Sequence, residues 1–493
     1  MSVQVPLNYN SVDDYKLFLK IKSLPAYSFV GRTAIVPDRY AEAIGMKPPH
    51  RQTLRYRPRS SFLFDYQRAI AKMAIKKRKF CMFADCGLGK TLVYLEWAKH
   101  VSKVTSGAIL MICPLMVVEQ IMDEVKRFYG DTMPWEYIRS SNLQGWLNSG
   151  GRFGITNYEA LTQELTAGRL DAMIIDESSM LKSHYGKWGT RILQLGRGLE
   201  WKICGTGTPA PNDRIEYANH AVFMDAFPNV NSFLARFFVN RGQTSGRWEM
   251  KAHAVEPFYR ALSDWSIFLA NPAVYGWKDH SDDIPPIHVH IEHVPLTQEQ
   301  YIAIGKVTNQ LFVTEVGGIG TRSKLSQISK GRVGKHSIPE NKTAYIRSLI
   351  DSWPDESTII WCLYNAEQET MARAFPDAAN IAGSTPHTKR LELLADFKSG
   401  RTKVLITKPK ILGYGLNLQV ATRQIFSGLQ DSYESYYQAV KRSNRVGSTK
   451  PLNVHIPVTD AEWPMVQTVI RKSKQVQQDT EAQERIFRQH AWK

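Results

Sequence analysis

The sequence predicts an α/β protein of two units, each a parallel sheet with helices on both faces. Short apolar runs alternate with helical patterns across residues 59–213 and again across 291–475. Such alternation is typical of parallel strands joined by crossover helices. Residues 214–290 interrupt the pattern with two apolar stretches of helical spacing, so we expect a helical insertion between the two alternating regions.

The apolar runs also give the expected strands and boundaries. Strands are expected near residues 80, 110, 173 and 203, and at 358–364, 403–407, 423–427 and 453–457. We assign residues 59–290 to the first unit, with a helical protrusion over 214–290, and residues 291–475 to the second. Residues 476–493 are polar and predict a tail helix at the surface.

Residues 1–58 predict a small basic α+β module. Leu17, Ile21 and Leu24 fall on one face of a helix, and two β-prone pieces, "AYSF" and "TAIVP", follow it with a turn at Gly31. A second helix, "DRYAEAI", has Asp38 in the N-cap position. A structural collar on the first unit is one interpretation of this pattern. The order of its elements also resembles the HARP-type domain that precedes the motor in fork-remodelling annealing helicases, which implies a module that recognises DNA junctions.

The composition points to a polyanionic partner and away from membranes. The 493 residues include 63 Lys and Arg against 46 Asp and Glu, a formal net charge of +17. Such an excess favours nucleic acid as the partner. No apolar run is long enough to span a bilayer, the N-terminus lacks the features of a signal peptide, and the five cysteines show no CxxC or zinc spacing. We expect a protein of the reducing cytoplasm.

A glycine-rich loop between a strand and a helix predicts a phosphate site. The stretch "ADCGLGKT" at 84–91 follows the Walker A pattern GxxxxGK[ST], with Ala in place of the first Gly. Gly87 and Gly89 permit a tight turn that directs backbone N–H groups at phosphate. Lys90 is expected to reach the β- and γ-phosphates of ATP, and Thr91 to ligate Mg²⁺.

An acid pair supplies the second half of this chemistry. The apolar run at 172–175 predicts a buried strand that ends at Asp176 and Glu177. We expect Asp176 to hold Mg²⁺ through water and Glu177 to polarise the attacking water.

Two arginines lie far along the chain from these groups. In "QAVKRSNRVG", Arg442 and Arg445 follow Gln438, and helical spacing would point both guanidiniums the same way. A solvated helical face is one interpretation. The other is a pair of arginine fingers, delivered by the second unit, that stabilise charge on the γ-phosphoryl group.

Ordered motifs over residues 62–475 resemble those of the Swi/Snf-like group of superfamily-two helicases and translocases. They are "FDYQ", "ICPLMVVEQIMDEVKRF", "ITNYEAL", "DESS", "GTGTPAPN", "ILGYGLNLQVAT" and "QAVKRSNRVG". The resemblance implies two RecA-like lobes. It also implies further contacts: Gln67, Gly415 and Gln438 to the nucleotide, and Pro114, Thr156, Asn157 and Asn417 to nucleic acid. "DESS" lacks the family's final His, which concerns the coupling of hydrolysis to movement.

The resemblance implies an ATP- and Mg²⁺-dependent motor on duplex or branched DNA, and we expect it to remodel forks or junctions in replication, recombination or repair. A bare motor of this size is typical of a bacterial cell or a phage-infected host, and we expect a monomer. Two alternatives stay open. One is a non-catalytic DNA clamp; the other is the motor subunit of a restriction or defence complex.

Overall fold

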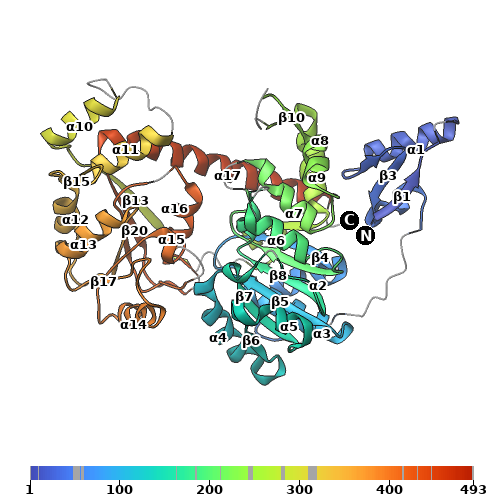
Figure 1. Ribbon diagram of the computed structural model, residues 1–493, viewed down its shortest axis with the longest axis horizontal. Coiled ribbons are helices and arrows are strands. Elements are labelled where there is room, and N and C mark those ends of the chain that lie inside the picture. Colours follow the sequence, from blue (N-terminus) through green and yellow to red (C-terminus); the bar gives the residue numbers. More distant parts are fainter. Residues whose placement is uncertain are drawn as a thin grey trace. The chain divides into compact units, whose positions relative to one another are not determined.

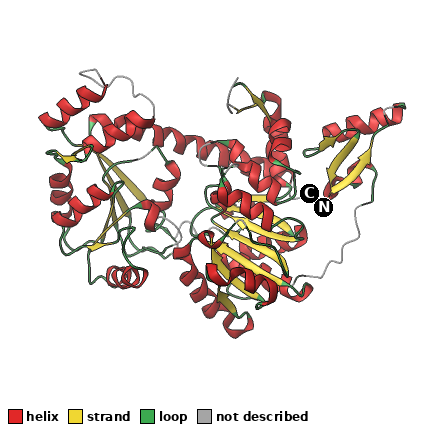
Figure 2. Cartoon of the chain, viewed as in Figure 1, coloured by secondary structure: helices red, strands yellow, loops and turns green. Residues whose placement is uncertain are grey.

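The computed structural model describes residues 2–8, 10–47, 56, 60–162, 164–183, 186–210, 213–242, 248–278, 284–308, 319–412, 416–429, 431–445 and 447–490. The chain divides into two compact units, Met1–Asp279 with Gln478–Lys493, and His280–Gln477. In each unit helices surround a large sheet (Figures 1 and 2). The expected boundary at residue 290 is wrong in detail, because strand β13 (Ile287–His293) runs through it.

The first unit contains a seven-stranded sheet in the order β12-β4-β9-β8-β5-β7-β6, and every neighbouring pair is parallel. Its strands are β4 (Lys79–Ala84), β5 (Ala108–Cys113), β6 (Trp135–Tyr137), β7 (Phe153–Asn157), β8 (Leu170–Asp176), β9 (Trp201–Gly205) and β12 (Ser266–Leu269). The four expected strands are confirmed as β4, β5, β8 and β9. Strands β6, β7 and β12 were not expected; β6 and β12 have only three and four residues, and β7 contains a Gly and two polar residues.

Both faces of this sheet are buried, which explains why its central strands are continuously apolar. Alternate residues of β4 enter two separate cores, with Cys81 and Phe83 on one face and Phe80 and Met82 on the other. One core is covered by α2 (Asp65–Lys77), α3 (Lys90–Val104) and α4 (Val118–Tyr129). The other is covered by α5 (Leu143–Ser149), α6 (Lys187–Leu195), α7 (Ala218–Phe223), α8 (Val230–Phe237) and α9 (Val255–Ser263).

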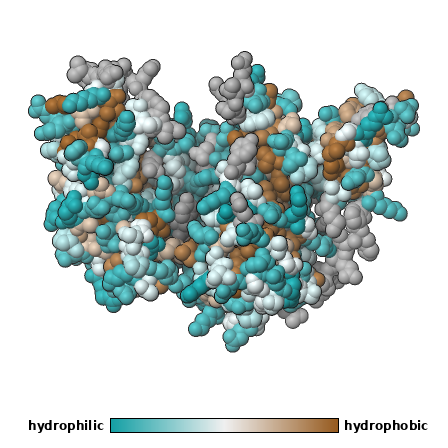
Figure 3. All heavy atoms as spheres, in the orientation of Figure 1, coloured by the Kyte–Doolittle hydropathy of each residue, from teal (hydrophilic) through white to brown (hydrophobic). Residues whose placement is uncertain are grey.

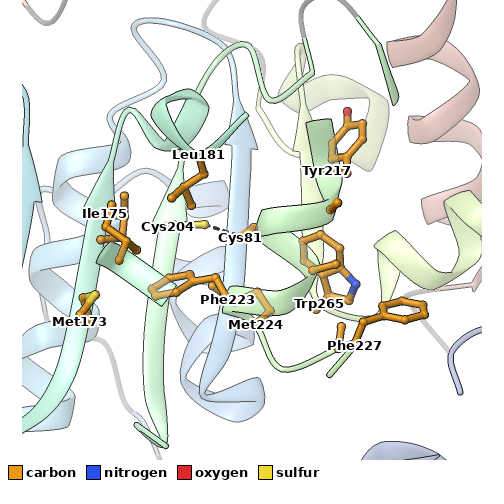
Figure 4. Close-up of a cluster of buried hydrophobic side chains, with 14 of the residues drawn as sticks. Cys81, Met173, Ile175, Leu181, Cys204, Tyr217, Phe223, Met224, Phe227 and Trp265 are labelled. Carbon is orange, nitrogen blue, oxygen red and sulfur yellow. Dashed lines mark hydrogen bonds between the residues drawn. The ribbon is translucent and has the colours of Figure 1, made fainter. Parts of the chain in front are cut away.

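Figure 4 shows part of the second core, where apolar side chains from strands and short helices converge. Cys81 and Cys204 lie on the paired strands β4 and β9, with 2.8 Å between their sulfurs. All five cysteines are buried free thiols, Cys86 of the glycine-rich loop included. Burial raises the pKa of Cys81 and Cys113 well above the ordinary thiol value, so both are packing residues.

The insertion after β9 is helical, as expected, with α7, α8 and α9. It also contains a two-stranded hairpin of β10 (Phe238–Asn240) and β11 (Trp248–Met250). The chain then returns to the sheet, where β12 pairs with β4. Residues 266–269 of the expected protrusion are therefore part of the sheet.

The N-terminal module is an α+β fold with a hydrophobic core of its own. Strands β1 (Ser2–Pro6), β3 (Thr33–Pro37) and β2 (Ser28–Val30) form an antiparallel sheet in that order, and α1 (Val12–Ser23) packs on it through Ile21. The turn at Gly31 is confirmed, with φ of 56°. The expected Asp38-capped α-helix is wrong: two 3-10 turns, Asp38–Tyr40 and Glu42–Ile44, stand there, and Asp38 is the first residue of a turn. Figure 3 shows apolar groups on the visible face of this module.

The second unit contains a six-stranded sheet in the order β13-β20-β19-β16-β18-β17, again with parallel pairing throughout. The four expected strands are confirmed as β16 (Thr358–Trp361), β18 (Val404–Thr407), β19 (Arg423–Phe426) and β20 (Leu452–Val458); β13 and β17 (Ala379–Asn380) were not expected. The remaining elements are α10 (Gln298–Thr308), α11 (Ile319–Ser329), β14 (Arg332–Val333), β15 (His336–Ser337), α12 (Lys342–Asp351), α13 (Asn365–Ala374), α14 (His387–Lys398), α15 (Pro409–Leu412) and α16 (Tyr433–Val440).

A buried ionic cluster ties the second unit together. The carboxylate of Glu462 accepts from both Lys330 and Lys342, and all three side chains are almost fully buried. Lys342 also donates to the carbonyl of Ser427, which directly follows β19. Burial lowers the pKa of Lys342 to about 8, while Glu462 opposes that shift. The cluster joins α11 and α12 to the ends of β19 and β20.

The last helix, α17 (Trp463–His490), contributes to both units, since Gln478 onward belongs to the first. The expected tail helix at the surface is therefore wrong near its end, where Gln483 and Glu484 are buried and Ile486 and Phe487 enter the two cores of the first unit. Phe487 packs edge-on against Tyr275, with ring centroids 5.7 Å apart. No helix in the described part of the chain, α17 included, has the length and apolarity needed to span a membrane.

Phe487→Ala should destabilise the first unit by about 3–5 kcal/mol, because it removes a fully buried ring from a packed core. Thermal and denaturant unfolding measure the loss. Arg485→Ala, an exposed change in the same helical turn, is the matched control. Equal unfolding curves for the two variants would show that the end of α17 is not part of the core.

Candidate functional site

Three loops meet at one edge of the first sheet. Strands β4, β9 and β8 are neighbours and run parallel, so their carboxyl ends lie side by side. The glycine-rich loop follows β4, the "TGT" segment follows β9 and the acid pair ends β8. The sheet topology therefore brings together groups that are far apart in the sequence, at the edge where open α/β sheets bind ligands.

The glycine-rich loop has the geometry of a phosphate cradle. Gly87 and Gly89 both have positive φ, 88° and 66°, and Gly89 caps the N-terminus of α3. Lys90, the first residue of that helix, donates through Nζ to the carbonyls of Ala84 (3.0 Å) and Asp85 (3.4 Å). Its ammonium therefore lies over the loop, at the N-terminus of α3, where the helix dipole is positive. Thr91 follows it and is half-buried.

Gln67 supports this loop from α2. Its Oε1 accepts from the backbone N–H of Phe64 (2.9 Å), and its Nε2 donates to the carbonyls of Leu88 (3.3 Å) and Gly89 (3.4 Å). A side chain at Gly89 would collide with that amide, so the position requires Gly for space as well as for φ. The contact of Gln67 with adenine stays a prediction.

The acid pair is buried and held by hydrogen bonds. Asp176 and Glu177 are 7% and 5% exposed. The hydroxyl of Tyr158 donates to the carbonyls of Asp176 (2.6 Å) and Glu177 (3.2 Å). Thr206 donates through Oγ1 to the carboxylate of Glu177 (3.2 Å). Glu177 itself has left-handed backbone angles, φ 51° and ψ 52°.

The electrostatics of the pair favour a bound cation. Burial raises the pKa of Asp176 well above the ordinary carboxyl value, the neighbouring Glu177 raises it further, and Lys90 lowers it. A divalent cation would remove this penalty, and carboxylate and hydroxyl oxygens are suitable ligands for Mg²⁺. The described residues contain no cluster of three or more His, Cys, Asp or Glu arranged to hold a metal. Asp176 and Thr91 nevertheless fit the usual Mg²⁺ arrangement, in which substrate phosphates and water complete the shell.

In the second unit, the two arginines do not share a helical face. Helix α16 ends at Val440, and residues 441–445 form turns, so Arg442 is 1% exposed while Arg445 is partly exposed. The solvated-face interpretation is therefore wrong for Arg442. Its Nε donates to the carbonyl of Gln438 (3.0 Å), but Nη1 and Nη2 have no hydrogen-bond partner within the described residues. Arg445 donates from Nη1 to Oδ1 of Asn417 (2.9 Å).

The other predicted contacts differ in accessibility. Pro114 lies half-buried directly after β5, Asn417 is exposed, and Asn157 is 8% exposed and caps the turn after β7. Thr156 is fully buried, and its hydroxyl donates to the carbonyl of Ile138 (2.8 Å), so the prediction that it contacts nucleic acid is wrong in this structure. Gln438 is buried, and Gly415 lies outside the described residues.

The site includes residues that the sequence analysis did not select. Thr206 and Tyr158 both bind the acid pair, and both lie inside quoted motifs, "GTGTPAPN" and "ITNYEAL". Their position inside these motifs was a usable signal. His220 bonds the residue after Glu177, and no motif marks it.

Comparison with known proteins gives the family. The model of the SNF2-related domain matches residues 66–338, and that of the helicase conserved C-terminal domain matches residues 341–447. The protein p41 of Acyrthosiphon pisum secondary endosymbiont phage 1 is 24% identical over 84% of this chain and 96% of its own length.

Two longer relatives match as well. The mouse DNA annealing helicase and endonuclease ZRANB3 is 22% identical, over 80% of this chain and 38% of its own length. The helicase/translocase YwqA of Bacillus subtilis is 22% identical, over 81% of this chain and 46% of its own length. This chain thus spans less than half of either relative.

Among solved structures, the Sulfolobus solfataricus SWI2/SNF2 ATPase core in complex with dsDNA is 19% identical. The match covers 83% of this chain and 90% of the solved chain, with a TM-score of 0.40. The SNF2-related model alone matches more than half of this chain. The chain therefore belongs to the SNF2-related family and is an ATP-hydrolysing enzyme of the helicase class.

Proposed function

We propose that the chain hydrolyses ATP to translocate on duplex or branched DNA. One observation carries the chemical part: Glu177, whose buried carboxylate is bonded to Thr206, directly follows β8, and β8 lies two strands from β4, which leads to Lys90. An acid and a phosphate-binding lysine at one sheet edge are the parts that phosphoryl transfer requires. The net charge of +17 supports a polyanionic track.

The roles follow from the geometry of each residue. The N–H groups of the loop around Gly87 and Gly89 and the ammonium of Lys90 bind the phosphates. Thr91 and Asp176 would hold Mg²⁺, which would neutralise phosphate charge. Glu177 orients a water for in-line attack and accepts its proton. Thr206 fixes the carboxylate of Glu177 in the orientation that this transfer needs.

We further propose that Arg442 and Arg445 stabilise the charge that develops on the γ-phosphoryl group. The buried η-nitrogens of Arg442 have no partner among the described residues, which supports this role because such a guanidinium is suited to a planar oxyanion. Arg445 is held in place by Asn417. Gln438 supports Arg442 through its carbonyl.

The N-terminal module offers a second level of specificity, and we propose that it directs the motor to forks and junctions. It presents exposed Tyr15 beside a row of contacting rings, Phe18, Phe29 and Tyr27, and the ammonium of Lys22 lies 5.3–5.8 Å from the last three. Aromatic and basic groups together are suited to unpaired bases. The name of the mouse relative, an annealing helicase, agrees with this proposal.

Lys90→Ala should abolish ATP turnover, and Glu177→Gln should lower kcat at least about 10²-fold while ATP still binds, because only the proton acceptor is lost. Steady-state ATPase assays and nucleotide-binding titrations measure the two effects. Glu159→Gln, which changes an exposed acid of the first unit, is the control. Full activity of Glu177→Gln would favour the non-catalytic clamp hypothesis or another base.

Arg442→Ala and Arg445→Ala should each lower kcat about 10³-fold or more, the usual effect of losing an arginine finger, with little change in ATP affinity. Arg442→Lys, which keeps the charge but not the planar fork, tests the geometry without leaving a large void. Arg401→Ala, which removes an exposed pair with Asp396, is the control. If a variant loses DNA affinity but keeps kcat at saturating DNA, that arginine is a DNA contact.

Deletion of residues 1–58 should leave ATPase stimulation by linear duplex nearly intact and reduce binding and remodelling of forks and four-way junctions. Gel-shift titrations and branch-migration assays give the comparison, with RNA as a negative control for the track. A truncated protein that aggregates or loses all ATPase activity would support the structural collar. One that folds and remodels junctions at the full rate would refute the junction role.

A further inference from the structure

A short loop follows the acid pair and is held by a single helix of the insertion. It begins with the 3-10 turn Ser178–Leu181, directly after Glu177, and continues to Ser183. Helix α7 contributes two consecutive polar side chains, Asn219 and His220, that are 1% and 0% exposed. Polar side chains this deeply buried need specific partners, and both find them in this loop.

The first contact is between His220 and the residue that follows the proposed catalytic acid. Nε2 of His220 lies 3.0 Å from Oγ of Ser178, and Ser178 is also 0% exposed. A hydroxyl can donate or accept, so the bond forms with either neutral tautomer of the imidazole. The contact fixes the side chain, and with it the backbone, one residue beyond Glu177.

The second contact holds the far end of the same loop. Nδ2 of Asn219 donates to the carbonyls of Leu181 (2.7 Å) and Ser183 (3.0 Å). Because Asn219 and His220 are adjacent on α7, both ends of the loop are anchored to the same turn of this helix. The loop cannot shift along α7 without breaking these three hydrogen bonds, two of which join buried groups.

His220 also contacts the strand that leads to the phosphate loop. Its ring packs edge-on against Phe83 of β4, with centroids 5.3 Å apart and an interplanar angle of 85°. Burial lowers the pKa of His220 to about 4, so the imidazole is neutral at physiological pH. It therefore acts as a hydrogen-bonding and packing group between β4 and the loop of the acid pair, without adding charge.

The backbone of Glu177 gives these contacts a functional meaning. Non-glycine residues with φ near 50° are strained and persist where the surroundings over-determine them. Tyr158 holds the carbonyl of Glu177, Thr206 holds its carboxylate, and His220 holds the residue that follows. These three supports come from three separate segments of the first unit. Removal of one support would leave Glu177 in the site but would let its carboxylate change orientation.

We propose that His220 is a positioning residue for ATP hydrolysis: through Ser178 it keeps Glu177 in the left-handed conformation that aims its carboxylate at the attacking water. The role rests on the proposed function of Glu177. "DESS" ends in serine, and an imidazole from the insertion reaches this loop from outside the motif. A core histidine that merely satisfies its own hydrogen bonds is the competing interpretation.

A double-mutant cycle on kcat tests the proposal with Ser178→Ala, His220→Leu and the pair. Each single variant should lower kcat about tenfold, the effect of one lost buried hydrogen bond on the barrier, with the KM for ATP changed less than about twofold. The double variant should be no slower than the worse single variant, because both partners act through one bond. His220→Gln, whose amide reaches the position of Nε2, should recover most of the activity.

Thermal unfolding and ATP binding of every variant separate positioning from folding. Lower stability with an unchanged kcat in Ser178→Ala and His220→Leu would reduce His220 to a structural residue and overturn the proposal. Additive effects of the two changes, or no recovery in His220→Gln, would do the same. If His220→Leu fails to fold, Ser178→Ala and His220→Gln still give the answer. Glu177→Gln, assayed in parallel, reports separately on the proposed function: full activity there refutes the role of Glu177 itself.

Discussion

The parallel pairing of β4, β9 and β8 is the constraint on which the rest of the first unit depends. It places the ends of three strands, and hence Lys90, Thr206 and Glu177, along one short edge. Because side chains on both faces of the sheet are buried, no strand can slip by one residue without exchanging its two core faces. The register that packs the cores is therefore the register that assembles the site.

The same edge concentrates unfavourable features that a ligand would relieve. Asp176 and Glu177 are adjacent acids in a buried position, and burial raises the pKa of Asp176. Glu177 is held in a strained backbone conformation. A bound Mg²⁺ would relieve the first of these, since it would supply a cation for the two acids.

The sequence predicts what depends on local pattern and misses what depends on distant contacts. The phosphate loop, the acid pair and eight central strands each have a local signature, and all were found where expected. The burial of Arg442 could not be predicted, because it depends on where α16 ends. Thr156 illustrates the converse error: its motif position suggested a nucleic-acid contact, but its place in β7 turns the hydroxyl toward Ile138. His220 carries no motif, and only the packing of α7 reveals its contact with Ser178.

The central claim is that DNA stimulates the ATPase activity of the purified chain. The most direct measurement is its ATP turnover without nucleic acid and with duplex DNA, single-stranded DNA and RNA, each titrated over a range of salt. The account predicts low basal turnover, strong stimulation by DNA, and an apparent DNA affinity whose logarithm falls linearly with the logarithm of salt concentration. Turnover that ignores DNA, or that RNA stimulates equally well, would contradict a DNA-driven motor.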